Sequence, residues 1–203
     1  MKRNLYGSVL KHFLFAQPLF FLCLVSCATN HDSSPYSPVY VTGKARYVLL
    51  PPSNIEMPLD MAQQVTGRYG KQEFVLDAWV KADERGITIA LFNALGADMG
   101  QLSFDDAGIS FVSSFFPPSL KPEYIAADFQ FCFYRVDALV RALKDSGLTM
   151  VVAIYDSVTP EGGKEVRTIY SGRKRIIEIV KTRKLIQYTN FLRDYSYTLQ
   201  GAF

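Results

Sequence analysis

Short segments in which apolar and polar residues alternate account for much of the chain after residue 73. In residues 74–81 every second side chain is apolar, and a turn at residues 83–86 separates this segment from a similar one at 87–91. Successive side chains of a strand point to opposite faces of a sheet, so a period of two predicts strands with one buried face. The polar residues and the glycine at 83–86 predict that these two strands form a hairpin.

The same pattern recurs along the rest of the chain at spacings of roughly ten residues, which is typical of a β-sandwich or β-barrel. A turn at residues 105–108 joins two of the segments, and Gly162, Gly172 and Asn190 supply further possible turns. The additional strands that we expect are residues 101–104, 109–112, 148–156, 166–170, 175–180, 184–189 and 195–199.

The middle of the chain breaks this pattern and predicts two short helices. Prolines between residues 117 and 122 interrupt the strands, and residues 123–134 and 137–144 then place apolar side chains at helical spacing. Asp137 at the start of the second segment and Gly147 beyond its end are typical helix-terminal residues. We therefore predict a mainly β (α+β) fold with a small helical insert, whose helices plug the open side of a curved sheet.

The N-terminus has the features of a bacterial lipoprotein signal. Lys2 and Arg3 precede a mostly apolar run of thirteen residues, Phe13–Val25, which is too short for a membrane span. The run ends in Leu-Val-Ser-Cys at residues 24–27, which resembles the lipobox in which the cysteine is lipidated before cleavage. We predict that residues 1–26 are a signal peptide and that Cys27 carries the lipid. The alternatives are a secretory signal peptide with an incidental cysteine and an uncleaved anchor helix.

The segment that follows predicts a short tether in front of one folded domain. Residues 28–38 are polar and rich in serine and proline, a composition typical of linkers, and eleven such residues reach at most about 36 Å. We therefore divide the mature chain into a lipidated tether, residues 27–39, and a single domain, residues 40–203.

The charge of the mature chain gives no reason to expect a nucleic-acid partner. The full sequence has 22 basic and 19 acidic residues, and the signal peptide contains three of the basic ones and none of the acidic ones. The mature chain is therefore neutral overall, although residues 161–203 contain nine basic and four acidic residues. This basic C-terminal part is either an ordinary solvated surface or a contact face for a protein partner.

The cysteines and histidines exclude several kinds of chemistry from the domain. Cys132 is the only cysteine after Cys27, and both histidines precede residue 40, so the domain has no disulfide, histidine triad or histidine-ligated metal. The apolar residues around Cys132 favour a buried, inert thiol. Neither pair of closely spaced glycines, at 67–70 and 96–100, makes a phosphate-binding loop. We expect no cofactor, no metal and no enzymatic activity.

The order of these features resembles the outer-membrane lipoprotein receptor LolB, and more closely the bacterial lipoprotein family DUF3261. The residues that carry the resemblance are the turn sequence Asn-Ala-Leu-Gly at 93–96, the strand and turn at 100–108, and the Asp-x-Gln helix at 122–131. Together they span roughly residues 60–200. The chain departs from the LolB pattern at Ala94, where a proline is usual, and at Asp98, a charge that follows the loop closely.

The resemblance implies an unclosed antiparallel β-barrel, capped by short helices, whose apolar hollow holds acyl chains. It also implies a membrane or cargo loop formed by Asn93, Leu95 and Gly96, in which Leu95 contacts lipid; the alternative is that Leu95 folds back onto its own hairpin. Asp128 and Gln130 either belong to the site or brace their helix. The aromatic residues that we expect to line the hollow, or alternatively to fill a core, are Trp79, Phe92, Phe104, Phe111, Phe129 and Phe133.

Two functions follow for a chain anchored in this way. The first is a non-enzymatic lipoprotein that binds or accepts an acyl-bearing cargo, either a lipid or a lipoprotein. The second is an accessory envelope lipoprotein that docks a periplasmic protein partner, and a filled interior would favour it. Ala28 follows the lipidated cysteine, where an Asp would retain a lipoprotein in the inner membrane, so we expect the outer membrane, facing the periplasm.

Overall fold

A computed structural model of the chain describes residues 36–113, 116, 120–156 and 162–201. These residues form a mainly β fold with two α-helices and one short 3-10 helix, η1 (Pro52–Asn54). The elements before the α-helices are β1 (Val39–Tyr40), β2 (Arg46–Tyr47), β3 (Leu59–Tyr69), β4 (Gln72–Asp83), β5 (Gly86–Phe92), β6 (Asp98–Asp105) and β7 (Gly108–Val112). The α-helices are α1 (Pro122–Phe133) and α2 (Val136–Asp145), and the strands after them are β8 (Thr149–Tyr155), β9 (Lys164–Ser171), β10 (Lys174–Lys181), β11 (Leu185–Asn190) and β12 (Tyr195–Gln200).

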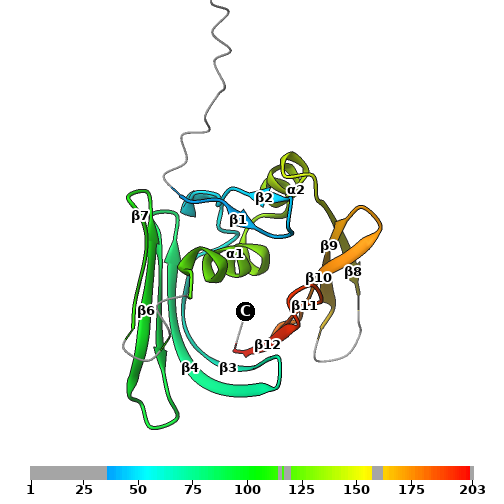
Figure 1. The fold of residues 1–203 in the computed structure, drawn as a ribbon. Coiled ribbons are helices and arrows are strands. Elements are labelled where there is room, and N and C mark those ends of the chain that lie inside the picture. Colours follow the sequence, from blue (N-terminus) through cyan, green and yellow to red (C-terminus); the bar gives the residue numbers. More distant parts are fainter. Residues whose placement is uncertain (1–35, 114–115, 117–119, 157–161, 202–203) are drawn as a thin grey trace, which may run out of the picture. The chain divides into compact units, whose positions relative to one another are not determined.

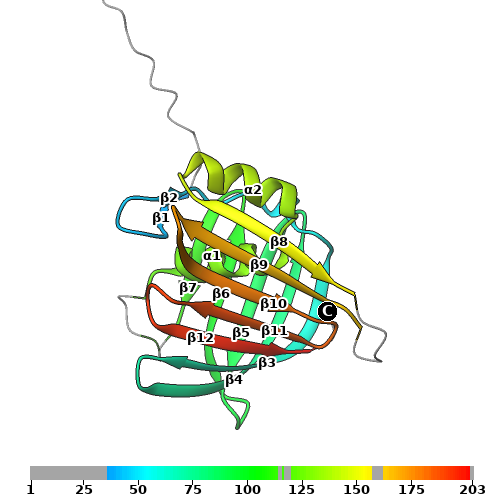
Figure 2. The ribbon, with the colours of Figure 1, turned by 90° about the vertical axis from the view of Figure 1, so that its right-hand side faces the viewer.

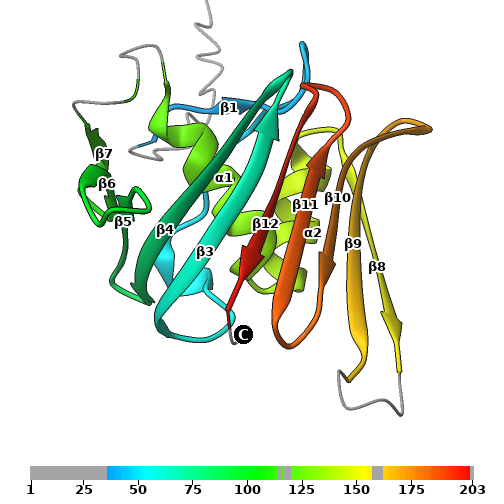
Figure 3. The ribbon, with the colours of Figure 1, turned by 90° about the horizontal axis from the view of Figure 1, so that it is seen from below.

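Ten strands form one antiparallel sheet in the order β7-β6-β5-β4-β3-β12-β11-β10-β9-β8. The sheet is therefore two five-stranded meanders, joined in the middle by the pairing of β3 with β12. Figure 1 shows that the sheet curves strongly, and Figure 3 shows the two meanders meeting at β3 and β12. The outermost strands, β7 and β8, are not paired with each other, so the sheet is an unclosed barrel, as predicted.

The inner face of this sheet follows from the alternation in the sequence. In β4, Ala78, Val80 and Ala82 are buried, whereas the residues between them are exposed. Val80 pairs with Ile89 of β5, which in turn pairs with Leu102 of β6, and all three side chains are buried. This register brings the apolar positions of neighbouring strands into one continuous face, which forms the core.

The connection between the two meanders places α1 inside the curve. The chain leaves the first meander at one edge of the sheet, β7, and enters the second at the opposite edge, β8. It therefore crosses the open side of the sheet, and α1 lies in the concavity (Figure 1). The apolar face of α2 packs against β8, with Leu139 and Leu143 fully buried (Figure 2). The two predicted helices are confirmed, and α1 is the one that fills the open side.

The N-terminal part of the domain begins earlier than the sequence predicted. The expected tether extended to residue 39, but Tyr36 and Val39 are buried, and the Tyr36 hydroxyl donates a hydrogen bond to the Asp105 carbonyl at 2.6 Å. Tyr36 also packs against the Phe104 ring, which gives this segment an apolar contact that a linker does not have. The signal peptide and Cys27 lie outside the described residues. Within the described ones, no helix has the length and hydropathy needed to cross a membrane.

Candidate functional site

The aromatic residues expected to line a hollow lie on two different faces of the sheet. Phe104, Phe129 and Phe133 are buried in the interior. Phe111 is half-buried at the end of β7, where its ring lies 5.7 Å from that of Phe116. Phe104, Phe129 and Phe133 belong to one apolar core cluster and Phe111 packs against it, so these residues help to fill the interior.

Trp79 and Phe92 do not point inward, and their assignment to an internal hollow was wrong. Trp79 lies between the buried residues Ala78 and Val80, so its side chain points to the convex face, where half of it is exposed. Phe92 pairs with Asp77, two residues before Trp79, and therefore belongs to the same convex face.

Asp128 ties the middle of α1 to the second meander. Its carboxylate accepts hydrogen bonds from the Tyr188 hydroxyl at 2.5 Å and from the Tyr195 hydroxyl at 2.6 Å. The Tyr188 ring stacks on the rings of Tyr195 and Tyr197. Burial raises the pKa of Asp128 to about 7, against the opposing effects of the two hydroxyl donors and the charge of Arg193. The helix is thus held by a half-buried carboxyl group at the end of a tyrosine stack.

Gln130 ties α1 to the N-terminal segment. Its side-chain oxygen accepts hydrogen bonds from the Tyr47 hydroxyl at 2.7 Å and from the Leu50 amide at 3.0 Å, and its side-chain nitrogen donates to the Leu50 carbonyl at 2.8 Å. Gln130 is completely buried, so these bonds satisfy a polar group that would otherwise destabilise the core. Of the two roles expected for the Asp-x-Gln pair, these three hydrogen bonds of Gln130 fit the bracing role.

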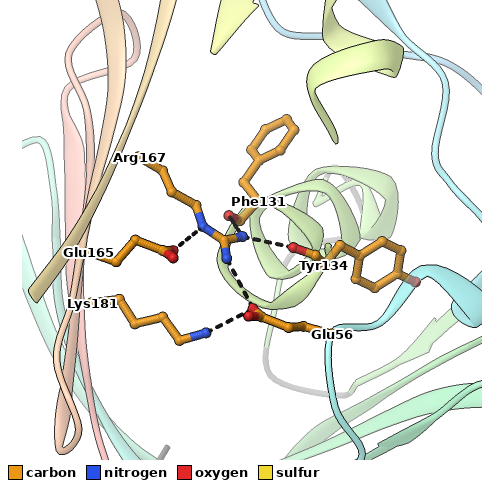
Figure 4. Close-up of polar contacts among 6 residues, drawn as sticks. All are labelled: Glu56, Phe131, Tyr134, Glu165, Arg167 and Lys181. Carbon is orange, nitrogen blue, oxygen red and sulfur yellow. Dashed lines mark hydrogen bonds and ion pairs between the residues drawn. The ribbon is translucent and has the colours of Figure 1, made fainter. Parts of the chain in front are cut away.

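Arg167 fixes the C-terminal end of α1, as Figure 4 shows. Its guanidinium group is fully buried and donates to the carbonyls of Phe131 at 3.2 Å and Tyr134 at 2.8 Å. The same group forms ion pairs with Glu165 at 2.5 Å and Glu56 at 3.1 Å. The last carbonyls of a helix have no partners within the helix and carry partial negative charge, which explains why a cation is favourable here.

Arg167 was not predicted as a key residue, although the sequence contains a signal for it. In β9, Arg167 alternates with Ile169 and so lies on the face that the other strands fill with apolar residues. A charged residue at such a position needs buried partners, because an unpaired charge in a core is strongly unfavourable. The position of its partner Glu56, far away in sequence, could not be read from this pattern.

Cys132 is buried in α1, as the sequence predicted. Burial is the main reason that the pKa of its thiol rises to about 12. A thiol with such a pKa is protonated at neutral pH and is a poor nucleophile and metal ligand.

Two open depressions lie on the outer face of the sheet. One, of about 310 Å³, is lined mostly by polar residues at β4, β5 and β6 that include Lys81, Thr88 and Ser103, together with Ile87 and Phe104. The other, of about 210 Å³, lies over β10, β11 and β12 and includes Glu178, Gln187 and Thr198. Neither depression is lined by α1 or resembles an apolar cavity for an acyl chain.

A family model matches the ten-stranded sheet in full except for its first residue, Leu59. The model, described as a protein of unknown function, DUF3261, matches residues 60–201. The chain belongs to this family. The matched segment of this DUF3261 protein contains Asp128, Gln130 and Arg167, but it begins after Tyr47 and Glu56. No relative among curated proteins matches the chain.

In this DUF3261 protein, the loop between β5 and β6 presents Leu95 to solvent. Leu95 is 92% exposed, so it does not fold back onto its hairpin. The Asn93 side chain accepts hydrogen bonds from the amides of Leu95 and Ala97, both at 2.9 Å, and the Gly96 amide donates to the Asn93 carbonyl at 2.8 Å. Gly96 has a φ of +76°, a conformation that favours glycine. Asn93 and Gly96 therefore shape the loop, and Leu95 is its exposed apolar residue.

Other exposed apolar side chains of the DUF3261 protein lie at the same end of the sheet. Because the strands are antiparallel, the turns β3–β4, β5–β6, β9–β10 and β11–β12 all leave this end. Besides Leu95, the exposed apolar residues in or next to these turns are Tyr69, Phe74, Val75, Phe191 and Leu192.

Proposed function

We propose that this chain is a non-enzymatic envelope lipoprotein that accepts an acyl-bearing cargo, a lipid or a lipoprotein, in the space that α1 occupies. The observation that carries the proposal is an apolar helix in the concavity of a sheet whose edges are not joined. A sheet with two free edges can widen without breaking strand pairs, whereas a closed barrel cannot.

The composition of α1 supports its role as a replaceable plug. From Ala126 to Phe133 the helix buries seven of its eight side chains, and five of those seven are apolar residues other than cysteine. An acyl chain that displaced the helix would cover the same inner faces of the strands, and each buried methylene contributes about 0.8 kcal/mol. This gain offsets the loss of the three polar attachments at Asp128, Gln130 and Arg167.

The turns at the Leu95 end of the sheet give the cargo a surface for its first contact. Leu95 stands at this end of the sheet on a loop that Asn93 braces, so contact with a lipid or lipoprotein does not require the domain to unfold. Lipid on Cys27, at the outer membrane as Ala28 indicates, would keep the domain near its cargo. Both parts of this anchoring are expectations from the sequence.

A photoactivatable fatty acid tests the proposal on the full-length protein in detergent. We expect cross-links on α1 and on the inner faces of β10–β12, because the chain replaces the helix there. Trp79 is the only tryptophan and lies on the convex face, so we expect a brominated fatty acid to leave its fluorescence unchanged. Cross-links confined to the convex face, or none at all, would exclude an internal acyl site.

A pair of variants makes this experiment sharper. Tyr195→Phe removes one of the two donors to Asp128, so the helix is held less firmly and labelling of the inner face increases. Arg141→Gln serves as the control, because Arg141 is exposed on α2 and pairs with the exposed Asp137. Equal labelling of both variants would mean that α1 does not control access.

A second candidate is the docking of a protein partner, with the barrel as a rigid scaffold. The packed interior favours it, because a scaffold needs no hollow. In-cell cross-linking from Leu95 distinguishes the two: a single protein partner together with no fatty-acid labelling of the interior supports the scaffold.

A further inference from the structure

Three neighbouring turns form one continuous surface at the end of the second meander. They are residues 68–71 between β3 and β4, residues 173–175 between β9 and β10, and residues 191–194 between β11 and β12; we call them the basic ridge. The Gly70 amide donates to the Asp194 carbonyl at 3.1 Å, and the Phe191 amide donates to the Ile176 carbonyl at 2.9 Å. The Arg175 guanidinium lies 4.3 Å from the centre of the Phe191 ring. Figure 2 shows the three turns following one another along one side of the sheet.

The ridge combines positive charge with exposed apolar side chains. It contains six basic residues and one acidic residue, Asp194, which pairs with Arg68 at 3.3 Å. Within the described part of the chain, Lys71, Arg173 and Lys174 make no ion pair. Tyr69, Phe191 and Leu192 are 64%, 42% and 39% exposed. Cations and apolar groups are thus interleaved over three adjacent tips.

The opposite end of the first meander carries the opposite charge. The turns at residues 83–85 and 105–107 contain four acidic residues and one basic residue. These acidic turns lie at the end of the sheet away from the basic ridge, so an anionic surface would attract the ridge and repel these turns.

We infer that the basic ridge binds the headgroup region of an anionic lipid surface, with Tyr69, Phe191 and Leu192 at the depth of the headgroups. Basic residues next to apolar ones are the combination that binds a charged lipid interface. Three adjacent turns are small beside the fitted area, about 800 Å² on each side, that a stable protein interface needs. A fluid lipid surface adapts to the outline of these turns and so suits them better than a folded partner. The inference rests on the proposed function, since it names the surface from which cargo is taken up.

The test uses the full-length protein with an environment-sensitive fluorophore (NBD) on Leu192→Cys. Cys132 is buried and protonated, and Cys23→Ser and Cys27→Ser remove the other two cysteines of the full-length chain, so labelling is selective for the new cysteine. We expect the emission to shift to the blue and to brighten on vesicles of phosphatidylglycerol and phosphatidylcholine, and to stay unchanged on phosphatidylcholine alone. The same label on Ile154→Cys, an exposed position at the other end of the sheet, should not respond.

Charge variants decide whether the ridge itself is responsible. The combined variant Lys71→Gln, Arg173→Gln, Lys174→Gln should lose the response, and high salt should weaken it in the unaltered protein. The matched control, Arg85→Gln, Arg183→Gln, Lys184→Gln, removes three exposed cations from the opposite end and should keep the response. Equal responses on both kinds of vesicle, or loss in the control as well, would overturn the inference.

Two further outcomes separate this inference from its alternatives. A response to soluble polyglutamate, with none to vesicles, would overturn it in favour of an acidic protein partner. If the triple ridge variant lost the vesicle response but still cross-linked the fatty acid on α1, the ridge would be a lipid-surface contact independent of the internal site. Failure of fatty-acid labelling with an intact vesicle response would count against the proposed function alone.

Discussion

Arg167 has no exposed surface, yet it is charged and lies on the apolar face of β9. Its donors are shared among two carboxylates and two carbonyls at the end of α1, so β9, the segment before β3 and α1 each contribute an acceptor. Such an arrangement does not make the fold more stable than apolar packing would, because removing the charge from water is unfavourable. It does make the position of α1 specific, since the carbonyls at the C-terminal end of the helix need this buried donor.

Replacement of Arg167 by Met should destabilise the protein by about 3 kcal/mol, because two helix carbonyls lose their buried donor. Arg167→Lys should recover only part of this loss, since an ammonium group cannot reproduce the forked geometry of the guanidinium group. Midpoints of urea unfolding measure both effects. Arg141→Met, at an exposed pair on α2, is the control and should leave the midpoint unchanged. A Lys variant as stable as the unaltered protein would mean that charge alone matters.

Asp128 should make the stability of the protein depend on pH in an unusual direction. Its pKa is about 7 in the folded protein and near 3.8 when unfolded, so between these values the native state binds more protons. The stability that this group contributes is therefore present below about pH 4 and is lost as the pH rises to 7. The tyrosines and the thiol around it do not titrate in this range, because burial raises the pKa of Tyr188, Tyr195, Tyr197 and Cys132.

The variant Asp128→Asn removes this dependence and keeps the shape of the side chain. Relative to the variant, the unaltered protein should lose on the order of 2 kcal/mol of stability between pH 5 and pH 8. Urea unfolding at both pH values measures the stability of the unaltered protein and of the variant. Subtracting one from the other removes the contribution of the other carboxyl groups, which both proteins share. Asp60→Asn, at an exposed position of β3, is the control. If the two variants followed the same pH profile, Asp128 would be ionised throughout.

At the scale of elements, regular alternation predicted strands well and irregular alternation did not. Most expected strands and both helices are present, because their buried faces are almost wholly apolar. β3 was not predicted, although it is one of the two central strands of the sheet. Its inner face includes the buried Gln63 and also Gly67, over which the Phe74 ring lies, so its apolar pattern is interrupted twice. Only the partner strands reveal why these residues are tolerated.

In the β5–β6 loop, one residue, Asn93, fixes the backbone shape and another, Leu95, provides the exposed apolar surface. Asn93→Ala removes the acceptor of two amides and should destabilise the protein by about 1 kcal/mol, as for the loss of a capping side chain. Leu95→Asp should leave stability within about 0.5 kcal/mol, because this side chain has almost no contacts to lose. Thermal unfolding measures both changes. A large loss for Leu95→Asp would show that the leucine packs somewhere in the folded protein.

At the scale of the whole molecule, the sequence predicted the class of fold and the place of the helices but not which side chains meet inside. The alternation in β4 already places Trp79 opposite the face of Ala78, yet an aromatic residue in an expected barrel was assigned to its interior. Whether a curved sheet encloses a hollow depends on how far α1 enters it, and this depends on Arg167 with Glu56 and on Asp128 with Tyr188. Such pairs join residues 60 or more positions apart, which a local pattern does not reveal.

The exchange of backbone amide hydrogens reports directly on whether α1 stays in the core. In the full-length protein without ligand, amides of α1 should be protected about as well as those of the central strands β3 and β12, because all three are held in the core. The edge strands β7 and β8 should exchange faster, since each has only one neighbouring strand. On addition of a fatty acid, α1 should lose protection while β3 and β12 keep it, because the acyl chain takes the place of the helix and leaves the strand pairs intact. Arg167→Lys should reach the same loss at lower fatty-acid concentration, since one attachment of the helix is already weakened. If α1 kept its protection and only the turns slowed their exchange, the cargo would be held at the exposed end of the sheet and the helix would be a permanent part of the core.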